Sequence, residues 1–386
     1  MIRLLVAGDF CLSGRMKNSS SYEISSSLSS IKPYVNSADY SLLNLECSVF
    51  DNTYEPIKKI GPNLHNTSES LKALKDIGFN GVTLANNHFA DYGHDAVVES
   101  VSLLRKYNID YYGGGENIEE ASKVKFINIY SKKIAIINCC EHEYTIASTK
   151  KGGSNPLDII EISKLIQKIK SECNYIILIV HGGAEHYQLP TPRMQKWYRF
   201  FIDVGADVVI NHHQHCFSGF EYYKSKPIVY GLGNFCFDSD NYRQSQWNKG
   251  YMLQLDLDND IRIDQIPYIQ CDDKIGTHVL YNDSSFREEL ETLCSIIKDE
   301  SEIINRYERY MDTLMREYMY LFEVKNNRIL RRLFNKGLIP DKFAKELISQ
   351  PLYKDNNKLL TLLSYFQCET HNDAMKSLLN KLYKEI

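Results

Sequence analysis

Short apolar runs rich in β-branched residues alternate with amphipathic windows through the first two thirds of the chain. The predicted strands are Arg3–Ala7, Tyr40–Leu45, Gly81–Ala85, Lys133–Cys139, Tyr175–Val180, Ala206–Asn211 and Pro227–Gly231. Predicted helices lie between several of these strands, at Glu69–Ile77, Ala96–Tyr107, Ile159–Cys173 and Arg193–Val204. Because parallel strands need long crossover connections, this alternation predicts an α/β fold with a mainly parallel sheet covered on its faces.

The character of the chain changes after the last of these strands. Tyr251–Leu257 and Ile261–Ile266 alternate with period two and predict a β-hairpin. A polar stretch near Asp272–Ser285 follows, and it predicts a first domain of residues 1–272 and a helical C-terminal region of residues 273–386. Within that region, helical spacing marks Phe286–Phe322, Asp341–Ser349, Lys358–Tyr365 and Asn372–Lys384.

The composition of the chain argues against a nucleic-acid-binding protein, a membrane-spanning protein and an exported protein. The formal net charge of the 386 residues is −4, which gives nucleic-acid binding no global electrostatic support, and none is expected. No window approaches the roughly 18 apolar residues that a membrane-spanning helix needs. The N-terminus makes a poor export signal, because its short apolar run leads straight into Asp9. The ten cysteines are scattered through strand-like segments, so we expect reduced thiols and a cytoplasmic location.

Polar side chains recur where the predicted strands end. In open α/β sheets, ligands bind in the crevice beyond the carboxyl ends of the strands, so these side chains should converge there. The residues at such positions are Asp9, Glu46, Asn86, Asn87, His88, His181, His212, His213, His215 and Asn234.

Carboxylate, amide and imidazole groups together predict a site for one or two divalent ions such as Mn, Fe or Zn. Taken singly, members of the set have plain structural interpretations: Asp9 as a turn cap, Asn86-Asn87 as a turn, and His181 as a hydrogen-bonded structural histidine. His213 and His215 are stronger candidates, because alternate residues of an extended segment point the same way. The combination favours a metal site.

The same residues resemble a known family. Gly8-Asp9, Asn44-Leu45-Glu46 and the blocks LANNHFADYG at 84–93, GADVVINHHQH at 205–215 and YGLGNF at 230–235 are similar to the signatures of CapA proteins. That family serves capsule and poly-γ-glutamate biosynthesis and is similar to calcineurin-like metallophosphatases. The resemblance covers most of residues 1–240, with the motifs in the right order.

The resemblance implies a four-layer α/β/β/α sandwich, here with a C-terminal helical extension, and a metal centre at one edge. It implies that Asp9 and His215 hold one ion, that Glu46 bridges, and that Asn87, His181 and His213 hold a second. It further implies that His88 is a general acid oriented by Asp91 and that Glu185 has a catalytic role as a base or supporting group. Substrate contacts are expected from Asn86, His186, His212 and Asn234.

The chain departs from the family pattern at several positions. Cys11 stands where metallophosphatases place a histidine, and we interpret it as a core thiol rather than a ligand, which leaves the number of ions open. After His181 the chain has Gly182-Gly183-Ala184-Glu185-His186 in place of the usual Trp-Gly-x-Glu-Tyr. Gln214 replaces a proline and Asn211 a glycine. These changes bear on substrate and metal content more than on fold.

Three functions follow as hypotheses. The first is a metal-dependent hydrolase of phosphoester or γ-glutamyl amide bonds in capsule, poly-γ-glutamate or other envelope polymer biosynthesis. The second is an accessory factor that binds such a polymer without cleaving it. The third is a metal-dependent peptide epimerase with His88 and Glu185 as its two bases. The expected partner is an anionic small molecule, peptide or polymer, and the C-terminal helices are candidates for a homo-oligomer contact.

Overall fold

The computed structural model describes residues 1–320 and 356–384, with side chains for 1–314 and 360–378. The predicted helix Asp341–Ser349 lies outside the described residues. The chain divides into two compact units: Met1–Ile57 with Asn63–Ile304, and Lys58–Pro62 with Asn305–Ile386. The domain of residues 1–272 stays a prediction, and the first compact unit continues beyond it to Ile304.

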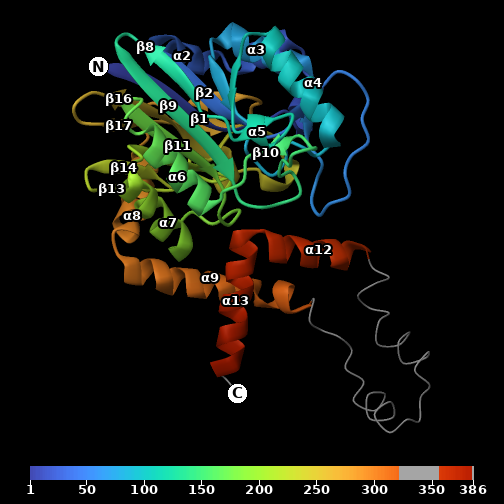
Figure 1. The fold of residues 1–386 in the computed structure, drawn as a ribbon, viewed down its shortest axis with the longest axis vertical. Coiled ribbons are helices and arrows are strands. Elements are labelled where there is room, and N and C mark those ends of the chain that lie inside the picture. The colour runs from blue at the N-terminus through green and yellow to red at the C-terminus, as the bar shows by residue number, and fades with distance from the viewer. Residues whose placement is uncertain (321–355, 385–386) are drawn as a thin grey trace. The chain divides into compact units, whose positions relative to one another are not determined.

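An eight-stranded mixed sheet forms one half of the first unit (Figure 1). Four neighbouring strands at its centre and one edge are parallel, and an antiparallel group continues from β1 to the other edge. In spatial order the strands are β18 (Thr277–Val279), β17 (Arg262–Gln270), β16 (Lys249–Leu257), β1 (Ile2–Cys11), β2 (Tyr40–Leu45), β5 (Gly81–Thr83) and β6 (Asp110–Tyr112), with β15 (Asn234–Phe237) paired to the end of β1.

A six-stranded sheet forms the other half. Its four inner strands are parallel and its two edge strands are antiparallel to their neighbours. In spatial order they are β13 (Phe220–Tyr223), β14 (Lys226–Val229), β12 (Val208–His212), β11 (Tyr175–His181), β9 (Lys132–Cys140) and β8 (Lys125–Ile129). Two small pairs complete the strands: β3 (Ser48–Val49) with β4 (His65–Asn66), and β7 (Gly114–Gly115) with β10 (Gly153–Ser154).

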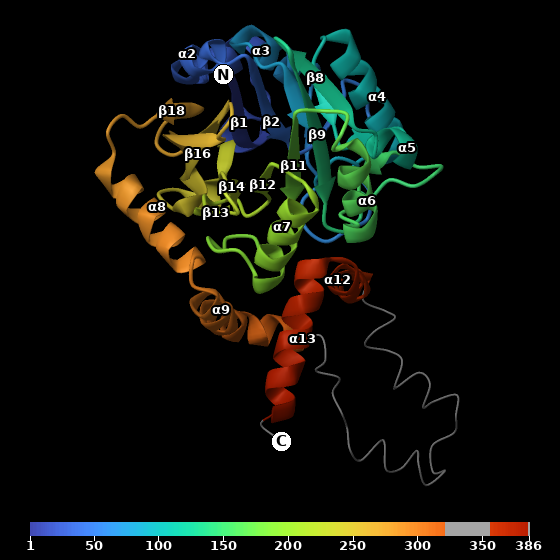
Figure 2. The ribbon, with the colours of Figure 1, turned by 60° about the vertical axis from the view of Figure 1, so that its left-hand side comes forward.

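Helices cover the outer face of each sheet. The helices of the first unit are α1 (Ser21–Ser27), α2 (Lys32–Ser37), α3 (Ser68–Ile77), α4 (Gly93–Lys106), α5 (Ile118–Ala121), α6 (Ile159–Ile169), α7 (Pro192–Val204) and α8 (Ser284–Ile297). Figures 1 and 2 show α6 and α7 beside β11, and residues of α3 and α4 share one core with residues of β1 and β2. The arrangement is the four-layer α/β/β/α sandwich that the resemblance implied.

The layers follow from the period-two pattern of the strands. In β1, Leu4 and Val6 join the core that includes residues of both sheets, whereas Leu5 and Ala7 join the core that includes α1, α3 and α4. Leu42 and Leu43 divide between the same two cores in β2. Because successive side chains of a strand point to opposite faces, a strand that is apolar at every position must be covered on both sides.

Each predicted strand is present near its predicted position, and the predicted hairpin is β16–β17. Helix ends carry the expected caps: the Asp158 side chain accepts from the backbone amides of Ile160 and Glu161 at the start of α6. Thr191 does the same for Met194 at the start of α7, where Pro192 occupies the first turn.

The C-terminal region is helical where it is described. Its helices are α9 (Glu300–Tyr320), α12 (Asn356–Gln367) and α13 (Glu369–Lys384). α12 and α13 are consecutive, and Tyr365 in α12 contacts His371 in α13 with ring centroids 5.0 Å apart. Among the described helices, none has both the length and the apolar character needed to cross a bilayer.

Candidate metal centre

Neighbouring strands of both sheets direct the candidate ligands to one region. Asp9 lies near the end of β1, Glu46 directly follows β2, His181 ends β11, and His213 directly follows β12. Asp9 lies at register shifts in the pairing of β1 with both β2 and β15. Such irregularities re-aim a side chain, and here they accompany the turn of Asp9 toward the histidines.

Glu46, His181 and His213 form the first group of candidate ligands. One atom from each lies within 4.8 Å of the others, and all three residues are buried. His181 Nε2 lies 3.6 Å from Glu46 Oε1 and 3.0 Å from His213 Nδ1. Asn87 Oδ1 lies 3.0 Å from the same His181 nitrogen, so an amide oxygen adds a fourth donor.

Asp9, Glu46 and His215 form the second group, also within 4.8 Å and buried. His215 Nε2 lies 3.7 Å from Glu46 Oε1, and His215 Nδ1 lies 3.7 Å from Asp9 Oδ2. Glu46 is therefore common to both groups. Carboxylate, imidazole and amide donors at this spacing fit one or two divalent ions of the Mn, Fe or Zn type.

His213 and His215 reach the site by a route that differs from the predicted one. β12 ends at His212, and both histidines have left-handed backbone conformations, with φ of 95° and 56°. The interpretation as alternate residues of an extended segment is wrong, although both side chains do reach the same site. Non-glycine residues with such φ values persist where the surrounding structure holds them, and they concentrate at functional sites.

Buried residues hold the acidic member of the second group. His212 Nδ1 lies 3.1 Å from Asp9 Oδ1, and Asn44 Nδ2 donates to the same oxygen at 2.8 Å. Burial of Asp9 would raise its pKa, but the contacts with His212, His215 and Asn44 lower it below the ordinary value. Asp9 is thus kept ionised, as a metal ligand must be.

Asn44 is a residue that the sequence reasoning passed over. Its Nδ2 lies 2.8 Å from Asp9 Oδ1 and 3.3 Å from His181 Nδ1, so it connects the two sheets behind the ligands. Its position two residues before Glu46, within the quoted Asn44-Leu45-Glu46 motif, was the available signal. Alternate residues of a strand share a face, which places Asn44 on the same side as Glu46.

His88 and Asp91 form a close pair beside the ligands. His88 Nδ1 lies 2.7 Å from Asp91 Oδ2, and both residues are buried. Asp91 Oδ2 also accepts from the Leu64 amide at 2.8 Å. Asn86 is fully buried: its Oδ1 accepts from the His88 amide and its Nδ2 donates to the Leu45 carbonyl, so it supports the turn.

Cys11 belongs to the core on the helix side of the eight-stranded sheet. The contact with Cys47 and its burial raise the pKa of the Cys11 thiol well above the ordinary value. Within the part of the chain that the structure describes, neither candidate ligand group includes it. These observations agree with the interpretation as a core thiol.

Glu185 and His186 are exposed, in contrast to the ligands. Desolvation would raise the pKa of Glu185, but the charges of His213 and His215 lower it to about 2. His186 has a φ of 60° and lies with its ring centroid 6.2 Å from that of His215. Asn234, by contrast, is fully buried, and its Oδ1 lies 2.9 Å from His215 Nδ1.

Comparisons with known proteins find similar sequences. The family "Bacterial capsule synthesis protein PGA_cap" matches residues 3–239. The capsule biosynthesis protein CapA of Bacillus anthracis is 31% identical over 217 residues, covering 54% of this chain and 53% of that protein. The PGA biosynthesis protein CapA of Bacillus subtilis is 29% identical over 212 residues, covering 54% and 56%. The chain thus spans about half the length of these curated relatives.

Two further similarities are more distant. A probable polyglutamine synthesis accessory protein of Mycobacterium tuberculosis is 23% identical over 210 residues, covering 51% of this chain and 55% of that protein. A crystal structure described as a 5'-nucleotidase of Staphylococcus aureus aligns with a TM-score of 0.44 and 13% identity, covering 77% of this chain and 58% of that chain.

Proposed function

This chain belongs to the bacterial capsule synthesis protein family PGA_cap, and from that premise we propose that it is a metal-dependent hydrolase. Its substrate would be a phosphoester or a γ-glutamyl amide in the synthesis of a capsule, poly-γ-glutamate or other envelope polymer. The observation that carries the proposal is the position of Glu46 Oε1, 3.6 Å from His181 Nε2 and 3.7 Å from His215 Nε2. One carboxylate that faces both groups suits a pair of ions.

The residues present fit such ions by donor type. Asp9, Glu46 and His215 would hold one ion, and Glu46, Asn87, His181 and His213 the other. Bound there, divalent ions supply Lewis-acid stabilisation of a phosphoryl or acyl oxygen and activation of water. Elemental analysis of the protein measures whether one or two ions bind.

His88 would protonate the leaving group. Its Nδ1 contacts the Asp91 carboxylate at 2.7 Å, which favours the tautomer with hydrogen on Nδ1 in the neutral imidazole. Protonation then takes place at Nε2, and that nitrogen carries the proton that the leaving oxygen or nitrogen receives. Glu185, whose pKa is lowered to about 2, would be ionised at neutral pH, and its role would be that of a weak base or of a supporting group.

Elemental analysis and hydrolysis assays test the proposal together. Purified protein with added Mn, Zn or Fe should cleave a generic phosphodiester or a γ-glutamyl peptide, and chelation should abolish the reaction. His213→Ala should lose metal and activity. His278→Ala, which alters a histidine of β18 outside both ligand groups, is the matched control. Protein with bound metal that cleaves neither substrate would refute hydrolysis.

A second candidate is a polymer-binding accessory role, which is favoured by the similarity to the mycobacterial polyglutamine synthesis accessory protein. In that case the same site would bind carboxylates or phosphates without cleaving them. Titration of polyglutamate into the wild type and into His213→Ala separates the two: tight, metal-dependent binding without turnover supports the accessory role. Equal binding of polyglutamate by both proteins would show that the metal centre takes no part in polymer binding.

The location and assembly of the protein stay predictions. The ten cysteines all lie among the described residues, where they are free thiols. The expected homo-oligomer contact through the C-terminal helices can be tested by light scattering on the full chain and on a chain that ends at Ile304.

A further inference from the structure

Aromatic rings form a continuous column that starts at the candidate ligand His215. Its imidazole lies 4.7 Å, centroid to centroid, from the indole of Trp247. Trp247 is in turn stacked on Tyr242 at 4.7 Å with an interplanar angle of 20°. His186 lies beside the column, 4.9 Å from Tyr242 and 5.6 Å from Trp247. The column therefore connects the metal centre with the segment between β15 and β16.

Only the outer end of this column is open. His215 and Trp247 are only 5% and 6% exposed to solvent. Tyr242 is 38% exposed, and His186 is also exposed. A ligand that reaches the metal centre from this side would meet the phenol and imidazole faces. Aromatic faces of this kind bind rings by stacking.

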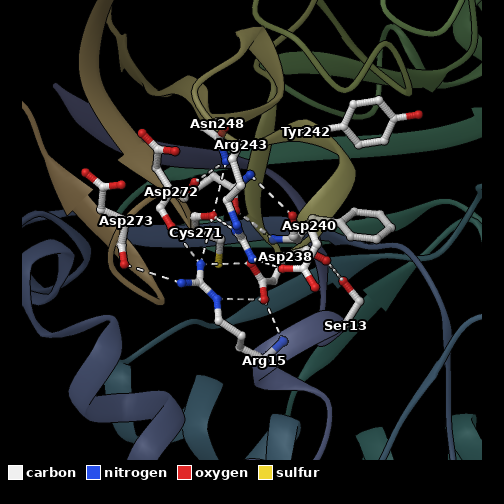
Figure 3. A network of polar contacts seen from close by, with 12 residues as sticks. Ser13, Arg15, Asp238, Asp240, Tyr242, Arg243, Asn248, Cys271, Asp272 and Asp273 are labelled. Atoms are coloured by element: carbon white, nitrogen blue, oxygen red, sulfur yellow. Dashed lines mark hydrogen bonds and ion pairs between the residues drawn. The ribbon is translucent and has the colours of Figure 1, made fainter.

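The segment that carries Tyr242 is tied to the body of the sheet (Figure 3). Arg243 forms an ion pair with Asp238, a carboxylate with no exposed surface, and donates to the carbonyl of Cys271. Arg15 holds the same Asp238 through Nη2 at 3.0 Å. The Gln244 amide donates to Asp272 at 2.8 Å. Figure 3 shows Tyr242 projecting away from this network, so its ring is held in place without being covered by it.

The same contacts neutralise the positive charge next to Tyr242. Arg243 follows Tyr242 in the chain, but its guanidinium is committed to Asp238 and to Asp240, the latter at 2.7 Å. The exposed end of the column thus offers aromatic rings, and the charge of Arg243 is paired with those two carboxylates. An anionic group would be held by the metal centre, and the adjoining part of the ligand by the rings.

We propose that Tyr242 and His186 form a subsite for a ring next to the anionic group of the substrate, which makes a ring-bearing phosphoester the substrate class. The inference rests on the proposed function and deepens it, because a γ-glutamyl chain carries no ring for this surface. A nucleobase through its flat face and a pyranose through its apolar C–H face can both pack against an aromatic ring, and the experiment separates these two sources.

Calorimetric titration of the manganese-loaded full chain tests the subsite. The probes are a hexose phosphate, a nucleoside monophosphate, glycerol phosphate and inorganic phosphate. At least one of the two ring-bearing probes should bind about tenfold more tightly than glycerol phosphate, the gain expected for one stacked ring. The ring that shows the gain identifies the source.

Variants assign that gain to Tyr242. Tyr242→Ala should remove the roughly tenfold preference and leave manganese stoichiometry and inorganic phosphate affinity unchanged, while Tyr242→Phe should keep the preference. Tyr22→Ala removes a more exposed tyrosine, on α1, and should change nothing.

Three results would overturn the subsite: equal affinity for ring-bearing and ringless phosphates, a preference that survives in Tyr242→Ala, or no binding of any probe to manganese-loaded protein. Protein that takes up none of manganese, zinc and iron would instead overturn the proposed function, and the inference with it. Loss of the ring preference alone, with manganese and phosphate still bound, would leave the proposed function standing.

Discussion

His215 Nδ1 lies 2.9 Å from Asn234 Oδ1, and this contact determines which imidazole nitrogen is available at the metal centre. An amide oxygen only accepts hydrogen bonds, so Nδ1 of the neutral imidazole carries the hydrogen and Nε2 keeps its lone pair. That lone pair belongs to the nitrogen 3.7 Å from Glu46 Oε1. Asn234 was expected to contact substrate, and its complete burial instead supports a positioning role.

Asn234→Ala is therefore expected to weaken metal binding without removing a ligand. Loss of such a supporting hydrogen bond typically costs 10–100-fold in metal affinity. The loss should concern the ion that we propose for Asp9, Glu46 and His215, and manganese titration by calorimetry measures it. Unchanged affinity at both positions would show that packing against Trp247 alone holds His215.

Glu46→Gln should affect both ligand groups, because Glu46 belongs to both. His181→Ala and His215→Ala should each affect one. Mass-spectrometric metal analysis of the three variants beside the wild type gives the stoichiometries. If the wild type holds two ions, we expect one in each histidine variant and the largest loss in Glu46→Gln. Retention of both ions by Glu46→Gln would exclude a bridging role.

Asp91→Asn tests the orientation of His88. An NH₂ group in place of Asp91 Oδ2 would face Nδ1 and favour the wrong tautomer, and it would also lose the hydrogen bond from the Leu64 amide, which contacts the same oxygen. We expect kcat for a metal-dependent hydrolysis to fall about 10²–10⁴-fold, the range for loss of general acid–base catalysis, with metal content unchanged. If kcat is retained, His88 is not the general acid.

Asp238→Asn should reduce stability in a pH-dependent way. Burial alone would raise the pKa of Asp238, but hydrogen bonds from Arg15 and Arg243 lower it below the ordinary value. An acid whose folded pKa is lowered contributes stability above its unfolded pKa, near 4, and loses it as pH falls through the folded value. We expect a loss of about 2 kcal/mol at pH 7 by urea unfolding, shrinking toward zero in acid. A constant loss across that range would contradict the ionic origin.

Much of the fold could be predicted because its determinants are local. The apolar runs that form β1, β2, β9, β11 and β12 can be recognised from residue type alone. Leu4 and Leu5 face opposite cores because successive side chains of a strand point to opposite faces. The candidate ligands could also be named, since Asp9 lies near the end of a strand, His181 ends one and Glu46 directly follows one.

What the tertiary structure decided is how these positions meet. Asn44 and His181 come from different sheets and lie 3.3 Å apart only because the sheets pack face to face. The left-handed conformations of His213 and His215, and the contact between the rings of His215 and Trp247, also depend on the folded structure around them. Local patterns determine which residues can form strands and offer ligands, whereas long-range packing determines where their side chains point.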